Sequence, residues 1–144
     1  MDMEVDERAL NDKLIEIEYL RRELEESINT LSSLQYAQES TASWLLGLDD
    51  VQKGVNKVLV PYSNEIFFDG EIKNTTSPLV NIGSNIFKRM NLDNLKSMLN
   101  ERLKVLNENI QSLLKGINEM QDRSKKLEDE VSSIYEKYRD SQMK

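Results

Sequence analysis

The sequence contains no cysteine and no histidine, and these absences remove several kinds of chemistry. Without cysteine the chain cannot form disulfides, thiolate zinc sites or cysteine nucleophiles. Without histidine it lacks the commonest metal ligand and the commonest general base. Carboxylates are abundant, but they fall at helical spacing on solvent faces, and no glycine-rich phosphate loop precedes a helix. We therefore expect no metal, no cofactor and no enzymatic activity.

Glycine, proline and aromatic residues are also scarce. The 144 residues include five glycines and two prolines, only 6% are aromatic, and 31% are charged. This composition is typical of long helices rather than of a compact core. No apolar run approaches the roughly 20 residues that a membrane span needs. Residues 1–7 are acidic where a targeting segment would be basic, so we expect a cytoplasmic protein without membrane contact.

The net charge of −7 is concentrated at the start of the chain. Residues 1–50 carry 13 acidic and four basic residues, a net charge of −9, whereas residues 92–144 are neutral. An acidic helix repels phosphate backbones, so nucleic-acid binding is disfavoured. The short basic run Lys125-Lys126 is offset by three acids that follow it. A helical arm that grips nucleic acid remains the weaker alternative.

Residues 6–46 have the pattern of one long helix. Apolar residues recur at alternating steps of four and three, which is the seam of a coiled coil. The expected seam positions are Leu10, Leu14, Ile17, Arg21, Leu24, Ile28, Leu31, Gln35, Gln38, Ala42 and Leu45. Asp2 or Asp6 could cap the start of this helix, and Gly47 is expected to end it.

A second helix is expected over residues 92–142, with a more regular seam. Asn91 is placed to cap it, and Asp93 lies in its first turn. Gly116 lies in its interior, at a cost of about 1 kcal/mol relative to alanine. The seam positions are Leu99, Leu103, Leu106, Ile110, Leu113, Ile117, Met120, Ser124, Leu127, Val131, Ile134 and Tyr138.

The middle segment, residues 56–90, abandons the helical period. Residues 57–62 and 65–72 read as two strands joined at Ser63-Asn64, and apolar residues alternate along the second. Residues 79–82 and 85–88 read as two more, with Gly83-Ser84 as a hairpin turn. Pro61 cannot donate to a strand ladder, so its strand should end there or lie at an edge. This pattern predicts two hairpins and four strands, forming a small sheet with one apolar face.

Two helices joined by a small β-module that reverses the chain should pair antiparallel and bury each other's seams. The expected fold class is therefore α+β and mostly α: a long antiparallel two-helix coiled coil connected by two hairpins. We expect residues 1–144 to form a single domain of this kind. Trp44, near the junction, is expected to be a packing anchor.

This organisation resembles the prefoldin family. Val58-Leu59-Val60-Pro61 in the first hairpin and Val80-Asn81-Ile82-Gly83 in the second are similar to the family's strand motifs. Two hairpins rather than one resemble its alpha class. Bulky Tyr62 follows Val60-Pro61, whereas alpha-class chains often have a small residue at this position.

The resemblance implies an ATP-independent chaperone. By this likeness, two alpha-type and four beta-type subunits would join their β-modules into a platform carrying six coiled coils. The tips would hold unfolded client proteins and deliver them to a group II chaperonin.

Residues for both roles can be named. A sheet with one apolar face and open edges invites another chain, so we expect eight residues to form the sheet core and the subunit contacts. For each of them, packing within the chain is the competing interpretation. They are Val58, Val60, Ile66, Phe68, Ile72, Val80, Ile82 and Ile86.

Client binding should use apolar side chains near the free helix ends, where flexible methionines suit varied sequences. The candidates are Met1, Met3, Val5, Leu10, Ile134, Tyr135, Tyr138 and Met143. Leu10, Ile134 and Tyr138 also lie on the expected seams, so packing between the helices competes with client contact. A structural filament or tether assembled through the β-module is the main alternative function, because heptads do not distinguish closed from open assemblies.

Overall fold

The computed structural model describes residues 2–142 and, within them, the side chains of residues 7–142. Along the chain, a helix of 51 residues is followed by two β-hairpins and then by a second helix of 51 residues. This order confirms the expected fold class. The elements are α1 (Asp2–Gln52), β1 (Lys57–Pro61), β2 (Phe67–Glu71), β3 (Leu79–Asn81), β4 (Phe87–Arg89) and α2 (Leu92–Gln142).

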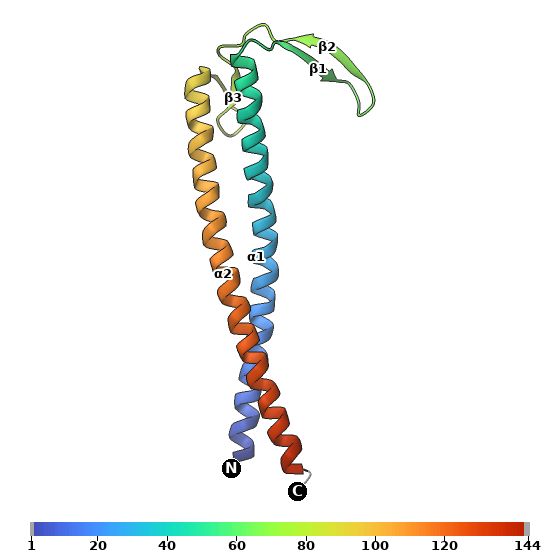
Figure 1. Cartoon of the computed structure of the whole chain (residues 1–144), viewed down its shortest axis with the longest axis vertical. Helices are drawn as coiled ribbons and strands as arrows, with labels where there is room; N and C mark the ends of the chain where they lie inside the picture. The colour runs from blue at the N-terminus through green and yellow to red at the C-terminus, as the bar shows by residue number, and fades with distance from the viewer. Residues whose placement is uncertain (1, 143–144) are drawn as a thin grey trace. The chain divides into compact units, whose positions relative to one another are not determined.

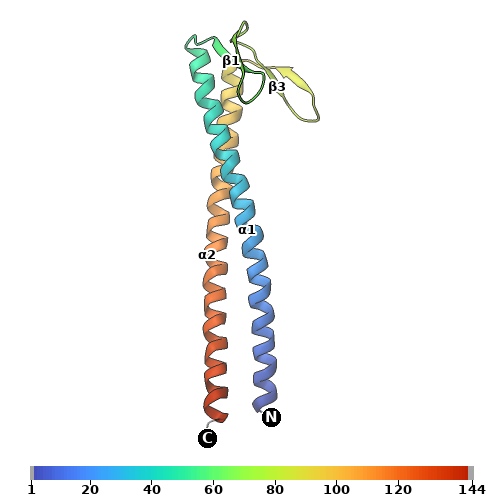
Figure 2. The ribbon, with the colours of Figure 1, turned by 90° about the vertical axis from the view of Figure 1, so that its right-hand side faces the viewer.

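The chain divides into two compact units, each containing part of both helices. Unit 1 combines residues 1–35 with residues 108–144, and unit 2 comprises residues 36–107. Within each unit, the segments of α1 and α2 run side by side in opposite directions (Figures 1 and 2). The antiparallel pairing expected from the sequence is therefore present in both.

Helix α1 continues through Gly47 instead of ending there. A single glycine costs about 1 kcal/mol, which is too little to end a helix whose next turn is tied to α2 through the Asp49–Lys96 ion pair. The helix continues to Gln52, and Gly54, two residues beyond that end, has φ +102°. Gly54 N donates to Val51 O at 3.1 Å, and Val55 N donates to Asp50 O at 3.0 Å. These two bonds form a Schellman motif, so Gly54 is the stop signal.

Helix α2 begins where the sequence places its cap. The backbone N of Asn94 donates to Asn91 Oδ1 at 2.7 Å, the bond that an N-cap asparagine provides. The backbone N of Leu92 donates to Thr76 O at 3.2 Å, so the loop between the hairpins also holds this end of the helix. Both bonds satisfy amide groups that the first turn leaves without helical partners.

Eleven of the twelve expected seam positions of α2 are buried or half-buried, which confirms the seam at these positions. Leu127 is only 1% exposed, and Leu99, Ile110, Ile117 and Val131 are also buried. Tyr138 is the exception, because 48% of its surface is exposed. The apolar stripe therefore extends almost along the whole helix.

The expected seam of α1 is partly wrong. Leu14, Arg21, Ile28 and Gln35 are exposed, although they were expected to face α2. The residue just before each of them is buried or half-buried instead. These inward-facing residues are Lys13, Leu20, Ser27 and Leu34, and the same series continues to Thr41, which is 2% exposed.

The strands form two separate two-stranded antiparallel sheets instead of one four-stranded sheet. In the first sheet Val60 lies opposite Phe68, and in the second Val80 lies opposite Lys88. The two hairpins extend separately from the end of the helix pair at which α1 ends and α2 begins (Figures 1 and 2). Every strand therefore has one edge without a partner strand within the described residues.

The second hairpin turns where Gly83-Ser84 predicts it. Gly83 has φ +122°, and Ser84 and Asn85 also have positive φ values, of 49° and 59°. Ile82 N donates to Ile86 O at 2.9 Å and closes the loop. Glycine adopts such backbone angles without steric cost, and asparagine tolerates them better than most residues.

Candidate assembly and client-binding surfaces

The first hairpin has one face that is entirely apolar. Because side chains alternate along a strand, Val58, Val60 and Tyr62 share this face with Ile66 and Phe68. Tyr62, the unusual residue after Pro61, packs its ring edge-to-face on Phe68, with ring centroids 5.9 Å apart. Its backbone N donates to Ile66 O at 2.9 Å, so this bulky residue fits the turn.

Gly70 gives this face its close packing. A Cβ atom at Gly70 would lie 2.8 Å from Val60 Cγ2 and 3.3 Å from Val58 Cγ2. The side chains of both valines therefore pack over Gly70 and fill the space that a side chain at position 70 would need. The missing side chain at Gly70 allows a compact apolar surface on a hairpin of only two strands.

The eight residues expected in the β-module are mostly exposed. Val58, Val60, Ile66, Phe68, Ile82 and Ile86 have between 38% and 59% of their surface exposed, and Ile72 and Val80 are half-buried. The expectation that they form the core of a sheet is therefore wrong for this chain by itself. Two strands have no opposing layer against which to bury one face. Their role in subunit contacts remains a prediction.

On each hairpin, the face opposite the expected assembly residues also carries apolar residues, which the alternating pattern of the sequence did not predict. Leu59 and Phe67 on the first hairpin, and Leu79 and Phe87 on the second, are each more than half exposed. The signal was present in the unbroken apolar runs of residues 58–60 and 66–68, because strands that are apolar on both faces become buried on both faces. These residues join the candidate assembly surface.

The two hairpins differ in charge. The first, residues 57–71, has Lys57 against three acids, Glu65, Asp69 and Glu71, for a net charge of −2. The second, residues 79–89, has Lys88 and Arg89 and no acid, for a net charge of +2. None of these six side chains is in an ion pair among the described residues.

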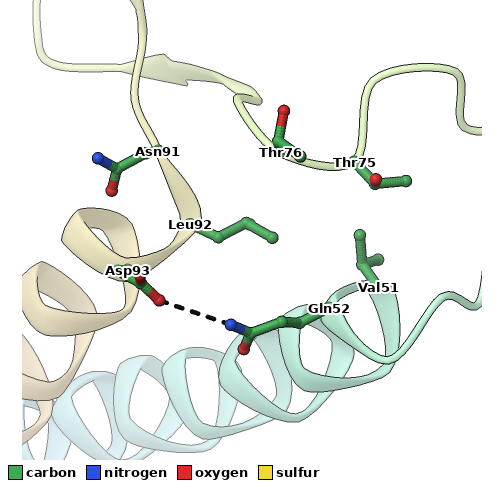
Figure 3. Close-up of a pocket in the computed structure, with 7 residues that line it drawn as sticks. All are labelled: Val51, Gln52, Thr75, Thr76, Asn91, Leu92 and Asp93. Atoms are coloured by element: carbon green, nitrogen blue, oxygen red, sulfur yellow. Dashed lines mark hydrogen bonds between the residues drawn. The ribbon is translucent and has the colours of Figure 1, made fainter.

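A small cavity lies where α1 ends and α2 begins (Figure 3). Its volume is about 340 Å³, and it is lined by Val51, Gln52, Thr75, Thr76, Asn91, Leu92 and Asp93. Gln52 Nε2 donates to Asp93 Oδ1 at 3.5 Å across one side. Lys96 pairs with Asp49 nearby, and hydrogen bonding from Lys96 lowers the pKa of that carboxyl. These contacts join the two helix ends beneath the hairpins.

The described residues among the predicted client-binding set lie where α1 begins and where α2 ends, two segments that run side by side in unit 1 (Figure 2). Met1 and Met143 lie outside the described residues, as do the side chains of Met3 and Val5. Leu10 and Ile134 are half-buried, as expected for seam residues. Tyr135 and Tyr138 are 50% and 48% exposed. The two tyrosines are thus the described candidates with the most surface available to a client.

Two ion pairs join the helices of unit 1 next to this end. Lys13 Nζ lies 2.6 Å from Glu130 Oε2, and the hydrogen bond from Lys13 lowers the pKa of Glu130. Arg123 donates from Nε and Nη2 to the two carboxylate oxygens of Glu16, at 3.0 and 3.2 Å. That hydrogen bonding raises the pKa of Arg123. A bidentate pair of this kind specifies geometry as well as supplying energy.

Trp44 does not anchor the junction. Its side chain is 53% exposed, so the expected role in packing is wrong. It lies on α1 one turn before Leu48, which is half-buried, and beside Leu45, which is half-buried as well. The inward positions of this part of the helix are therefore filled by smaller residues.

A sequence model of prefoldin subunits matches residues 4–137 of the chain. The chain belongs to the prefoldin family. The match covers both helices and both hairpins, so the whole arrangement described above is a prefoldin fold. Prefoldins are non-enzymatic chaperones that work as assemblies of subunits, so membership supports a prefoldin-like chaperone subunit rather than an enzyme.

A solved structure agrees with this fold. The chain is similar to filamentous PFD from Methanocaldococcus jannaschii, determined by cryo-EM, with 20% sequence identity and a TM-score of 0.50. The similarity covers 88% of this chain and 98% of the other. None of the curated proteins compared with the chain matches it. Among the described residues, no helix has the length and apolar character needed to cross a bilayer, and no cluster of three or more potential metal-binding side chains occurs.

Proposed function

We propose that this chain is an alpha-class prefoldin subunit that assembles through its two hairpins and holds unfolded polypeptides near its helix ends. The observation that carries the proposal is the exposure of apolar side chains on both hairpins of a prefoldin chain. An isolated two-stranded hairpin is marginally stable in water, and its edges accept further strands. Contact with other subunits would bury both features together.

The partners proposed are beta-type prefoldin subunits, four of them with two copies of this chain. Two hairpins per chain, as in the alpha class, allow one subunit to contact more than one neighbour. The assembly would pass its clients to a group II chaperonin without ATP, because apolar burial drives binding and competition from the chaperonin drives release.

The first test is the mass of the assembly in solution. Multi-angle light scattering is applied to this chain alone and to the chain coexpressed with a beta-type prefoldin subunit. A discrete complex of two copies of this chain with four of the partner is expected. A chain that remains separate from the partner at all concentrations would contradict the proposed assembly.

Client holding is tested separately, on the assembled protein. A version lacking residues 1–9 and 135–144 loses the candidate client contacts except Leu10 and Ile134, but it keeps both hairpins and both described interhelical ion pairs of unit 1. It should assemble normally yet no longer prevent aggregation of an unfolded protein. A double Tyr135→Ser, Tyr138→Ser variant tests the two exposed tyrosines without shortening a helix. Undiminished protection by both versions would place client binding elsewhere.

A second candidate function is a structural filament or tether. The observation that favours it is the similarity to filamentous PFD from Methanocaldococcus jannaschii. The same exposed hairpins can support an open chain of copies if the rotation between neighbours does not close a ring. Negative-stain electron microscopy of the purified chain distinguishes the two: long filaments support this function, and small discrete particles support the chaperone.

A further inference from the structure

The two hairpins carry charges of opposite sign on strands that have an open edge. Asp69 and Glu71 lie on β2, whereas Lys88 and Arg89 lie on β4. Among the residues that the structure describes, each of these strands is paired on one edge only, β2 with β1 and β4 with β3. The charged residues thus lie on strands whose second edge is open to another strand.

Resting on the proposed assembly through the hairpins, we infer that β2 of one copy pairs with β4 of a second copy, directed by the charges of Asp69, Glu71, Lys88 and Arg89. Opposite charges facing each other across two strands are favourable, and like charges are unfavourable. A contact between two first hairpins would bring four of these carboxylates together. A contact between two second hairpins would bring four cations together.

The apolar residues of the hairpins fit the same contact. On β2, Phe67, Asp69 and Glu71 share one face, and Phe68 lies on the other. On β4, Phe87 and Arg89 share one face, and Lys88 lies on the other. Pairing the two edges therefore places Asp69 and Glu71 on the same side of the joined sheet as either Arg89 or Lys88. At least one phenylalanine ring lies on that side as well. The contact buries exposed aromatic rings and neutralises charge in one step.

Two copies related by a two-fold axis make this contact twice. The first hairpin of each copy meets the second hairpin of the other, so both contacts are identical, as two-fold symmetry requires. The same pairing repeated in one direction would give an open chain. The inference therefore concerns which hairpin faces which, and it holds for either form of assembly.

Two matched variants test the inference. Asp69→Lys with Glu71→Gln changes the first hairpin from −2 to +1, and Lys88→Glu with Arg89→Gln changes the second from +2 to −1. Glutamine is chosen at 71 and 89 because Glu71 accepts from Asn56 Nδ2 and Arg89 donates to the Ser77 carbonyl, at 2.9 Å each. Each variant chain then carries two hairpins of like sign.

Self-association is measured by sedimentation, for each variant alone and for an equimolar mixture. Each variant alone should associate at least about tenfold more weakly than the natural chain, and the mixture should recover the natural affinity. Recovery excludes misfolding as the cause of the loss, because a misfolded hairpin cannot be rescued by mixing. A chain carrying all four changes should also associate, since its hairpins are again of opposite sign.

The outcomes separate this inference from the proposed function. If both variants associate as well as the natural chain, or if the mixture shows no recovery, charge does not direct the pairing and the inference is wrong. The hairpins could then still assemble through apolar contact alone. If the natural chain associates neither with itself nor with a beta-type subunit, the proposed assembly fails, and the inference fails with it.

Discussion

The line of residues by which α1 contacts α2 can be tested with a matched pair of substitutions. Leu20→Ala and Ile28→Ala remove side chains of the same size from one helix, within one unit. Leu20 is 9% exposed, whereas Ile28 is 49% exposed, although the sequence pattern placed Ile28 on the seam. The two variants therefore distinguish the observed seam from the expected one.

The expected costs follow from burial. Removing a buried leucine loses its transfer free energy and leaves a cavity, so Leu20→Ala should cost about 3 kcal/mol of unfolding free energy. Half of the Ile28 surface already contacts water, so the same truncation loses about 1 kcal/mol of burial and leaves no cavity. Alanine is also the better helix former by a few tenths of a kcal/mol, which brings the net cost for Ile28→Ala down to about 0.5 kcal/mol.

The assay is urea unfolding followed by circular dichroism at the helix band. All proteins are compared at one concentration, because association stabilises the folded state by mass action. The unfolding free energies of the two variants are expected to differ by about 2.5 kcal/mol. Equal costs, or a larger cost for Ile28→Ala, would show that α1 faces α2 along Leu14, Arg21 and Ile28 instead.

Three further perturbations test separate features. Gly116→Ala should stabilise the chain by about 1 kcal/mol in the same urea assay, because an added Cβ meets no atom within 4 Å; a loss of stability would mean that the helix packs closely there. Gly70→Ala should cost about 1–3 kcal/mol in the binding free energy of the subunits, measured by sedimentation, because its Cβ would displace Val60 from the apolar face; unchanged helix content is the control, and undiminished assembly would refute the role of that face. Hydrogen bonding from Lys13 lowers the pKa of Glu130 below its ordinary value of 4.5, so the stabilisation from this pair is present above that value and is lost as pH falls through the folded-state pKa. Glu130→Gln should therefore lose less stability than the natural chain between about pH 7 and about pH 3, and an identical loss would show that the pair contributes nothing.

Helix α2 could be predicted almost completely because its sequence offers only one interpretation. Its seam positions are nearly all apolar, and most of the residues between them are polar, so one face is clearly favoured for burial. The cap at Asn91 follows from local chemistry that does not depend on the rest of the chain. The two hairpins could be predicted for the same reason, because turn residues and alternating strands are local signals.

Helix α1 is different, because two neighbouring lines of residues are nearly equally apolar. One line contains Leu14 and Ile28 but also Arg21, and the other contains Leu20 and Leu34 but also Lys13. Both lines advance by the same heptad, so the repeat alone does not select between them. The ion pair from Lys13 to Glu130 makes a charged residue tolerable at an inward position. That compensation exists only once the helices are paired.

The prefoldin resemblance, the helix–hairpins–helix order, the seam of α2 and the start of that helix were all determined by the sequence itself, through local and periodic signals. The tertiary structure decided the inward face of α1, the continuation of that helix past Gly47, the separation of the strands into two sheets and the exposure of Trp44. Each of these depends on contacts between residues far apart in the chain. Their free energies outweigh local preferences of about 1 kcal/mol or less, which is why local signals could not anticipate them.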